Sequence, residues 1–337
     1  MKKRILITLA FSVITLVGAL LIGCAGKKDF TEYTNEYEPT LNAVNIALDV
    51  SEIEVNKCET GKIILHYYDT EADLYSVSEG SGVINMLRNT SDESNEKIKV
   101  GFGEKKYYKV TVSVPGEFAG TINLQTSSGD VTVKGITSDK VKVNVKSNSG
   151  EVKATGVVLS AFNVNGKTSG IKFKKVNIAD VSVVTASGDV RISDSECAKY
   201  AVNGESAEAE LKNVSIGQVS VTLTAGDTEL VNVKVGSSVY VSSTDGDISS
   251  DGLDAGSCTV TTKNGDIYLE NLWIGSAAYI ISEAGDIKAY ISDSVTGFTI
   301  DSVSEYGKNN LAGISGFGGF KNLTVRNITG DINIKFY

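Results

Sequence analysis

The chain has 337 residues, of which 41 are acidic and 32 basic, so its formal net charge is −9. This acidity argues against nucleic acid as a partner and against flat docking on anionic lipid, because both need a basic surface. A single histidine and four arginines leave little material for acid–base catalysis.

The N-terminus has the pattern of a bacterial secretion signal. Met1-Lys2-Lys3-Arg4 is a basic start, residues 5–21 are an apolar run, and Leu21-Ile22-Gly23-Cys24 closes it. This tetrapeptide resembles the lipobox of bacterial lipoproteins, which implies cleavage after residues 1–23 and a diacylglyceryl group on Cys24. A plain signal peptide with an incidental cysteine and an uncleaved anchor helix are the alternatives. We therefore expect a lipid-anchored protein that faces outward from a bacterial cell membrane, with a mature charge of −12 once three basic residues are removed.

Residues 24–40 are polar and aperiodic after the cysteine, as expected of a tether between the lipid and the folded part. Residues 41–119 contain strand-like segments at 44–48, 53–55, 62–68, 74–77, 97–100 and 107–114, with a probable-loop composition at 88–96. We expect this region to be a β-rich cap that hides the edge of the first coil.

One short phrase returns eleven times between residues 120 and 337: a small polar residue, then Gly, then usually Asp or Glu, with apolar residues alternating afterwards. The copies begin at Ser128, Ser149, Ser169, Ser187, Ser206, Ala225, Asp245, Asn264, Ala284, Tyr306 and Thr329. Their regular spacing of about 20 residues predicts an all-β fold, a single-stranded parallel β-helix (β-solenoid) over residues 120–337. The crossover preference of parallel strands favours a right-handed coil.

Three groups of apolar residues recur in each coil. Counted from the Gly, they stand at +2 and +4, at −7 and −5, and at +7, while the +3 residues are mostly charged or polar. Three inward faces predict a triangular cross-section. In the copy at Gly170 the apolar pair Ile171 and Phe173 comes one residue early, which predicts a turn shortened by one residue.

The turns combine a glycine with an acidic residue. Gly suits a left-handed or strained corner, and a neighbouring polar side chain can bond to the local backbone. Nine acidic residues would stack into a column about 5 Å apart. They are Asp130, Glu151, Asp189, Glu208, Asp227, Asp247, Asp266, Asp286 and Asp331. Backbone N–H capping of the carboxylates is one interpretation, and Ca²⁺ bound between neighbouring turns is the other; no other cofactor is expected.

Aromatic residues gather in the later coils and suggest a ligand face. Tyr240, Tyr268 and Trp273 are the candidates, with Tyr279 and Tyr290 near them. An outward stripe of such rings could stack on glycans, while packing at coil corners is the alternative.

The run from Lys109 to Pro115, leading into residues 122–131 and followed by the Ser-Gly-Asp copies, resembles a bacterial family of β-strand repeats named “putative adhesins”, a domain of unknown function. The resemblance covers roughly residues 42–337. It implies a single-stranded parallel β-helix displayed at the cell surface. It implies no catalytic residues.

An enzyme is not favoured by the remaining residues. His66 lies in an apparent strand outside the repeats, so no Ser-His or Cys-His pair can be argued. Cys58, Cys197 and Cys258 are an odd number and are expected to be free. Residues 307–319 form one irregular insertion that we expect to fold over the C-terminal end.

Together these features predict a non-enzymatic, lipid-anchored surface protein that acts as an adhesin or binds a ligand. Its partner would be a cell-surface glycan, a matrix protein or an envelope component. An envelope-stress sensor or decoy that binds a peptide, lipid or antibiotic is the first alternative. A polysaccharide-active β-helix enzyme is the second.

Overall fold

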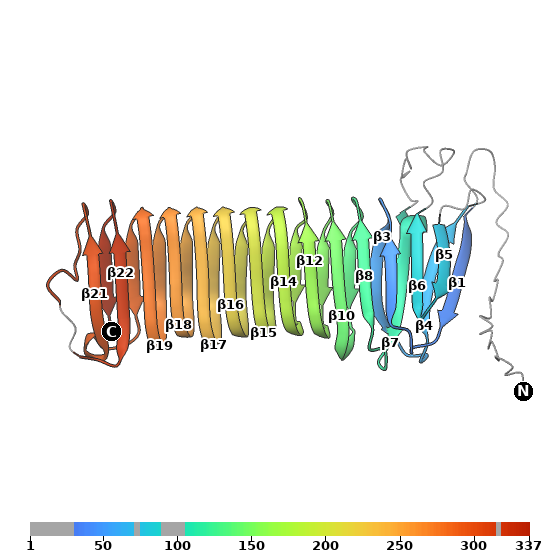
Figure 1. Cartoon of the computed structure of the whole chain (residues 1–337), viewed down its shortest axis with the longest axis horizontal. Helices are drawn as coiled ribbons and strands as arrows, with labels where there is room; N and C mark the ends of the chain where they lie inside the picture. Colours follow the sequence, from blue (N-terminus) through green and yellow to red (C-terminus); the bar gives the residue numbers. More distant parts are fainter. Residues whose placement is uncertain (1–29, 71–74, 89–104, 315–317) are drawn as a thin grey trace, which may run out of the picture.

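A computed structural model describes residues 30–70, 75–88, 105–314 and 318–337 (Figure 1). The predicted signal peptide, Cys24, nearly all of the loop at 88–96 and the strand expected at 97–100 lie outside these residues. Within the described residues, no helix is long and apolar enough to cross a membrane. The first half of the described chain forms β1 (Thr31–Tyr37), β2 (Ala43–Ala47), β3 (Glu52–Cys58), β4 (Ile63–Asp69), β5 (Tyr75–Gly80), β6 (Val83–Arg88), the 3-10 turn η2 (Lys105–Tyr108), β7 (Lys109–Pro115), β8 (Thr121–Thr126), β9 (Val131–Lys134), β10 (Thr137–Ser147), β11 (Val152–Thr155), β12 (Val158–Gly166) and β13 (Ile171–Lys174). The second half forms β14 (Asn177–Ser187), β15 (Val190–Ser206), β16 (Ala209–Ala225), β17 (Thr228–Asp245), β18 (Ile248–Asn264), β19 (Ile267–Ala284), β20 (Ile287–Ile291), the 3-10 turn η3 (Val295–Gly297), β21 (Phe298–Ser304), β22 (Lys321–Asn327) and β23 (Ile332–Phe336).

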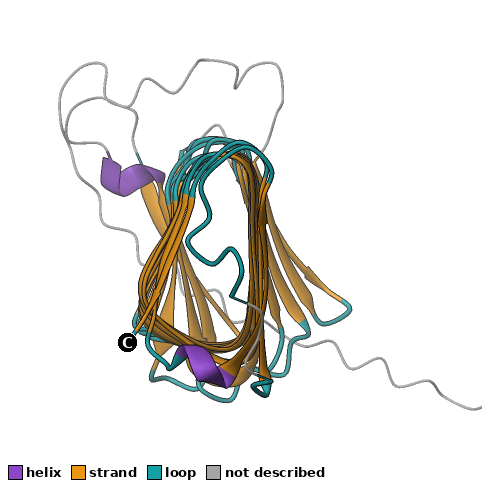
Figure 2. Cartoon of the chain, turned by 90° about the vertical axis from the view of Figure 1, so that its left-hand side faces the viewer, coloured by secondary structure: helices purple, strands orange, loops and turns teal. Residues whose placement is uncertain are grey.

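The predicted parallel β-solenoid is confirmed, with coils of about 20 residues stacked into a rod (Figure 1). Seen along the rod, each coil has two long sides, a short closing side, and a bundle of turns where the long sides meet (Figure 2). We call the long side that leads into each Ser-Gly-Asp turn the pre-turn side, and the long side that follows it the post-turn side. In one coil the pre-turn strand is 143–147, the post-turn strand is β11, and the short side begins at Val157.

The core is one continuous column of inward side chains, as the periodicity predicts. In that coil Val143, Val145, Val152, Ala154 and Val157 are all nearly inaccessible to solvent. Valine and isoleucine suit these positions because β-branched side chains pack well on a pleated surface. Each coil buries its apolar residues against the coils before and after it, so no coil has a core of its own.

The turn glycines are required by space rather than by backbone conformation alone. A Cβ placed on Gly265 would lie 2.2 Å from the carbonyl oxygen of Gly246 in the neighbouring coil. Gly265 does not have a positive φ. Of the left-handed or strained backbone expected at these corners, this turn does not have the left-handed form. The glycine is needed here because two backbones approach closely.

In six of the turns, a buried Ser or Thr hydroxyl three residues before the glycine completes the turn. Thr262 Oγ1 donates to the Gly246 carbonyl at 2.9 Å, and Ser282 Oγ donates to the Gly265 carbonyl at 3.1 Å. Both side chains are buried. These bonds satisfy backbone oxygens that the turn removes from water.

Three turns carry a side chain where the others have glycine, at Ser51, Ser169 and Ala207, and the last two compensate in the same way. Ser169 and Ala207 occupy the glycine position, and the residue three before each is Gly166 and Gly204. A Cβ on Gly204 would lie 2.9 Å from the Cβ of Ala207. In these two turns the glycine stands three residues earlier than in the others. The side chain at the usual glycine position occupies the space that this earlier glycine leaves free.

This exchange corrects the prediction of a shortened turn at Gly170. Gly166 pairs with Thr185, and Ile171 pairs with Val190, so the two neighbouring turns have the same number of residues. The Ser-Gly pair is shifted by one position within a turn of ordinary length.

We predict that Gly204→Ser destabilises the protein by about 1–3 kcal/mol, because its side chain overpacks against Ala207. Adding Ala207→Gly should restore most of the loss, since the pair then matches the other turns. Urea unfolding of the two single variants and the double variant measures the coupling. Additive effects of the two substitutions would contradict the compensation.

The strands of the predicted cap are partly coils of the same rod. β2 lies between β6 and β8, and β3 lies between β7 and β9, all in parallel. Only β1, β4 and β5 run antiparallel to their neighbours and close the end. The first coil in the sequence is therefore inserted between later ones, and β2 and β3 belong to the same stack of parallel strands as β6 to β9.

The C-terminal end repeats this insertion. β22 lies between β19 and β21, and β23 lies between β20 and residues 308–310. Residues 305–314 then cross the end of the rod (Figures 1 and 2), where Leu311 is buried. The Asn310 side chain donates to the Ile334 carbonyl at 2.7 Å and accepts from its N–H at 2.9 Å. The expectation that this segment folds over the C-terminal end is met by its described part.

Glu54 joins the first coils across their post-turn side. Its carboxylate accepts from Lys109 Nζ on β7 at 2.7 Å and pairs with Lys134 Nζ at the end of β9 at 2.8 Å. Burial alone would raise the pKa of Glu54, but hydrogen bonds and charge from the two lysines outweigh it and lower the pKa to about 2.

We predict that this carboxylate stabilises the fold at neutral pH by about 2–3 kcal/mol relative to Glu54→Gln. Because the folded pKa lies below the unfolded value of 4.5, the contribution is complete above pH 4.5 and is lost as the pH falls towards 2. Urea unfolding of both proteins between pH 3 and pH 7 checks this. A difference that stays constant over the whole range would contradict the assignment.

Candidate ligand-binding face

The acidic residues of the turns form the expected column, and their carboxylates cap the backbone. Asp247 Oδ1 accepts from the N–H of Asp266 at 2.7 Å, and Asp266 Oδ1 accepts from the N–H of Asp286 at 2.7 Å. The same bond joins Asp130 to Glu151, Asp227 to Asp247, Asp286 to Asp331, and Asp331 to Lys308. These six carboxylates thus bind the next turn, as the capping interpretation predicts.

Basic side chains offset part of the negative charge in the earlier turns. Glu151 pairs with Lys153 and Lys172. Burial raises the pKa of Glu151, but hydrogen bonds from these lysines outweigh it and hold the pKa below its usual value. Arg191 contacts Asp189 at 2.9 Å and Glu210 at 3.1 Å. Glu208 is also exposed on the column.

Among the described residues, no group of three or more His, Cys, Asp or Glu side chains is arranged to hold a metal ion. Calcium between the turns stays a prediction from the sequence. The geometry assigns the carboxylates a capping function that does not depend on a cation.

We predict that Asp266→Ala lowers stability by about 1 kcal/mol, because the N–H of Asp286 loses its acceptor. Asp266→Asn should cost less, since an amide oxygen can replace the carboxylate oxygen. Thermal unfolding with Ca²⁺ and with a chelator supplies the control. Two results together would instead favour the metal interpretation: Ca²⁺ raises the melting temperature of the unsubstituted protein, and Asp266→Ala and Asp266→Asn lower it equally.

The three aromatic candidates lie on three different sides of the coil. Tyr268 is on the post-turn side, Trp273 is on the short side, and Tyr240 is on the pre-turn side. The single stripe considered from the sequence is therefore not formed by these three residues. The contacts that each aromatic ring makes with neighbouring residues show whether it is available to a ligand.

Tyr268 belongs to a charged cluster at the C-terminal end of the post-turn side. Its hydroxyl donates to Glu270 at 3.0 Å, and Lys288 Nζ lies 5.0 Å from its ring centroid. The hydrogen bond to Glu270 raises the pKa of the Tyr268 hydroxyl. Tyr290 lies edge-on to Tyr268 and stacks on Tyr337. These contacts engage both the ring and the hydroxyl.

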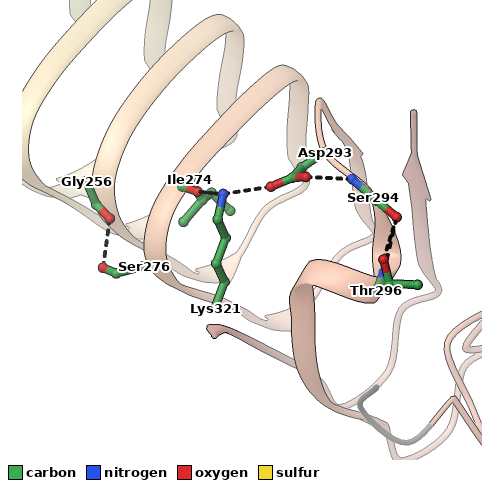
Figure 3. Close-up of polar contacts among 7 residues, drawn as sticks. All are labelled: Gly256, Ile274, Ser276, Asp293, Ser294, Thr296 and Lys321. Atoms are coloured by element: carbon green, nitrogen blue, oxygen red, sulfur yellow. Dashed lines mark hydrogen bonds and ion pairs between the residues drawn. The ribbon is translucent and has the colours of Figure 1, made fainter. Parts of the chain in front are cut away.

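Trp273 takes part in the joint that holds the last coil. Lys321 Nζ, at the start of β22, lies 4.8 Å from the centroid of the Trp273 ring. Figure 3 shows that it also donates to the Ile274 carbonyl, at 2.7 Å, and contacts Asp293, at 2.6 Å. The hydrogen bond from Lys321 lowers the pKa of Asp293. This arrangement positions β22 beside β19, so Trp273 has a structural partner.

The outward surfaces of the two long sides differ sharply in charge. We define the neutral face as the outward residues at two positions on each pre-turn strand from β6 to β19. It consists of Asn85, Leu87, Asn45, Ala47, Asn123, Gln125, Asn144, Lys146, Asn163, Asn165, Ser182, Val184, Ala201, Asn203, Ser220, Thr222, Tyr240, Ser242, Thr259, Thr261, Tyr279 and Ile281. Only Lys146 is charged among these 22 residues.

The charged face is defined as the outward residues at two positions on each of eleven post-turn strands, from β3 to β23. It includes β23, whereas the neutral face ends at β19 and leaves out β22, where Arg326 continues one of its columns. It consists of Glu54, Asn56, Thr132, Lys134, Lys153, Thr155, Lys172, Lys174, Arg191, Ser193, Glu210, Lys212, Glu229, Val231, Ser249, Asp251, Tyr268, Glu270, Lys288, Tyr290, Asn333 and Lys335. Thirteen of these 22 residues are charged. These two outward positions of the pre-turn side are therefore nearly free of charge, and Lys142, Asp180 and Lys199 stand two residues earlier on the same strands.

A ladder of asparagine side chains runs along the N-terminal part of the neutral face. Each Nδ2 donates to the Oδ1 of the next strand in the order Asn163, Asn144, Asn123, Asn45 and Asn85, at 2.7–2.8 Å. The ladder floors a depression of about 500 Å³ that spans β2 to β14. Each amide retains a second N–H and a second lone pair, so the depression can hydrogen-bond to a polar ligand.

The residues considered for catalysis do not form a catalytic group. His66 Nε2 contacts Glu32 Oε1 at 2.7 Å in the antiparallel end sheet. Cys58, Cys197 and Cys258 are free thiols, as expected. Burial raises the pKa of Cys197 and of Cys258 to about 12, which keeps both thiols protonated and poorly nucleophilic.

Several features could not be assigned from the repeat phrase alone. The buried hydroxyls of six turns were present in the sequence as Ser or Thr three residues before Gly. A second corner carries residues with positive φ, among them Asn213, Asn232 and Asn271. The neutral face was visible only as a shortage of charge at alternate positions. Its extent depends on β2 lying beside β8 and on β6 lying beside β2.

These features define a parallel β-solenoid with one charged and one neutral long side. The family model described as Toastrack DUF4097 matches residues 42–251 and 206–335. The chain belongs to this family. No curated protein matches the sequence.

Three solved structures are similar over most of their length. A “putative adhesin” from Bacteroides fragilis has 16% identity and a TM-score of 0.34, over 94% of this chain and 100% of that one. A “putative cell adhesion protein” from Clostridium sporogenes has 11% identity and a TM-score of 0.26, over 92% and 100%. A “putative lipid binding protein” from Parabacteroides distasonis has 13% identity and a TM-score of 0.38, over 91% and 96%. Similarity at this level says nothing about what this chain binds.

Proposed function

We propose that this protein is a non-enzymatic, lipid-anchored protein of the bacterial cell surface that binds its partner through the neutral face. The observation that carries the proposal is the difference between the two long sides, with one charged residue among 22 on the neutral face and thirteen among 22 on the charged face. Charged side chains are depleted in the centre of binding interfaces because they are costly to desolvate.

The shape of the rod supports the same proposal. The neutral face runs over eleven neighbouring strands, a length of about 50 Å at the usual strand spacing. Its depression of about 500 Å³ is floored by amides that can still form hydrogen bonds. A surface of this length suits an extended partner or a repetitive one.

Lipid anchoring supplies the location in this proposal. It rests on the sequence Leu21-Ile22-Gly23-Cys24, which lies outside the described residues. A lipid on Cys24 would place β1 and the antiparallel end sheet towards the membrane, with the remaining coils extending away from it.

We predict that a soluble chain from Gly26 onward binds saturably to intact cells or to isolated envelope and matrix components. Ser220→Glu, in the centre of the neutral face, should weaken this binding at least about tenfold, which corresponds to about 1.4 kcal/mol. The matched control is Ser249→Glu at an outward position of the charged face, which should change it less than about twofold.

The two variants introduce the same charge on opposite sides of the same rod, so a change in stability or net charge affects both. Equal loss of binding in both would contradict the neutral face as the site. Binding to none of the cells and components would contradict the proposed function. In a second arm, full-length protein should stay with bacterial membranes and Cys24→Ser should not.

A further inference from the structure

The C-terminal part of the neutral face has a composition unlike its N-terminal part. Three neighbouring strand segments, residues 238–243, 257–262 and 277–282, run in parallel register there. Tyr240 and Tyr279 lie in the same outward column with Thr259 between them, and the rings are 43% and 45% exposed. We call the outward residues of these three segments the tyrosine patch. None of them is charged.

From this geometry we infer that the tyrosine patch binds a neutral, extended β-1,4-linked glycan that lies along the rod. The inference rests on the proposed function, because it names the ligand class of the same face. It depends on three properties of the patch: the spacing of the rings, the hydroxyls between them, and the absence of charge.

The spacing of the two rings fits the repeat of such a chain. Tyr240 and Tyr279 are two strand intervals apart, which is about 10 Å. In an extended β-1,4-linked glycan, successive sugars are turned over, so every second sugar presents the same face, and this disaccharide repeat has nearly the same length. Two rings in one column can therefore stack on two equivalent sugars. A helical α-1,4-linked glucan has no such repeat.

The chemistry of the rings fits the faces of these sugars. Pyranoses with equatorial substituents carry only C–H bonds on their two faces. The face of an aromatic ring is negative, and it attracts the positive edge of such C–H groups. Neither Tyr240 nor Tyr279 has a ring or hydrogen-bond partner among the described residues, unlike Tyr268 and Trp273.

The hydroxyls between the rings are also available. Ser242, Thr259 and Thr261 point outward and have no hydrogen-bond partner in the described part of the chain. The inward hydroxyls of the same strands, Ser243 and Thr262, are bonded to the turns instead. Each outward hydroxyl offers one donor and two acceptors, which is the hydrogen-bonding pattern of a sugar hydroxyl.

The lack of charge selects a neutral glycan over other chains that stack on aromatic rings. Single-stranded nucleic acid needs a basic groove beside the rings, and the tyrosine patch has no basic residue on a chain of net charge −9. Acidic polysaccharides need the same counter-charge. The neutral face continues through Ser220, Ala201 and Ser182 to the asparagine ladder, so a longer glycan gains further contacts in the depression.

The test measures binding of the chain from Gly26 onward to cellohexaose and chitohexaose, with maltohexaose as the α-1,4-linked control. We expect both β-1,4-linked hexamers to bind at least about tenfold more tightly than maltohexaose and than their own disaccharides. Tyr240→Ser and Tyr279→Ser should each weaken this binding about fivefold or more. Serine already occupies this column at Ser182 and Ser220, so the fold accepts it.

Tyr268→Ser is the matched control, because Ser249 is its neighbour in the equivalent column of the charged face. It should leave glycan binding within about twofold, and thermal unfolding of all three variants verifies that each is folded. No binding to either β-1,4-linked hexamer, or binding that both patch variants retain, would overturn the inference.

The proposed function and this inference fail separately. If the chain binds cells through the neutral face, as Ser220→Glu reports, but binds no glycan, the inference is wrong and the proposed function stands. If protease treatment of the cells removes the binding and glycosidase treatment does not, the partner is a protein and the inference is again overturned. If no cell, component or glycan binds, both are wrong.

Discussion

The close contact between turn backbones is the constraint on which the rest of the structure depends. Most turns place a glycine against a carbonyl of the neighbouring coil, so there is room for hydrogen there and for little else. The buried hydroxyl three residues earlier and the acidic side chain one residue later both serve this contact. Because every turn is held at the same place, every strand follows in the same register. Equivalent residues of successive coils therefore form straight columns along the rod.

Because equivalent residues stack in columns, the type of residue at one position of the repeat sets the chemistry of a column along the rod. Where the outward columns hold Lys, Arg, Asp and Glu, opposite charges meet across neighbouring strands, as Arg191 and Glu210 do. Where they hold Asn, Ser and Thr, the side chains bond along the column or remain open to solvent. A repeated polar side chain finds its hydrogen-bond partner in two ways. In the asparagine ladder the partner is the same side chain of the next coil, and in the Asp column it is a backbone N–H of the next turn. Only the neutral face leaves donors and acceptors available without charge.

Much of the fold could be predicted because the repeat is local. The +2 and +4 alternation, the inward −7 and −5 pair and the period are properties of a single coil, and a sequence shows them directly. The order of the end strands could not be predicted, because β2 carries Ser51 rather than Gly at the turn and has no recognisable phrase. The turn at Gly170 was wrongly predicted to be short for a related reason. The turn needs one small residue at either of two positions, here Gly166 or Ser169, and a search for the repeat phrase considers only one of these positions. The aromatic candidates were found as residues, but their separation onto three sides depends on corners that no single repeat reveals.

The insertion of β2 and β3 at one end and of β22 and β23 at the other has a consequence for how such a rod can change in evolution. A coil added at either terminus of the gene would not lie at an end of the rod, because the first and last coils of the sequence are already enclosed by others. Between β14 and β19, by contrast, each coil pairs only with the coils before and after it in the sequence. Duplication or loss of one coil there changes the length of the rod and leaves both ends intact. The length of the rod is thus a heritable variable that is set in the middle of the gene.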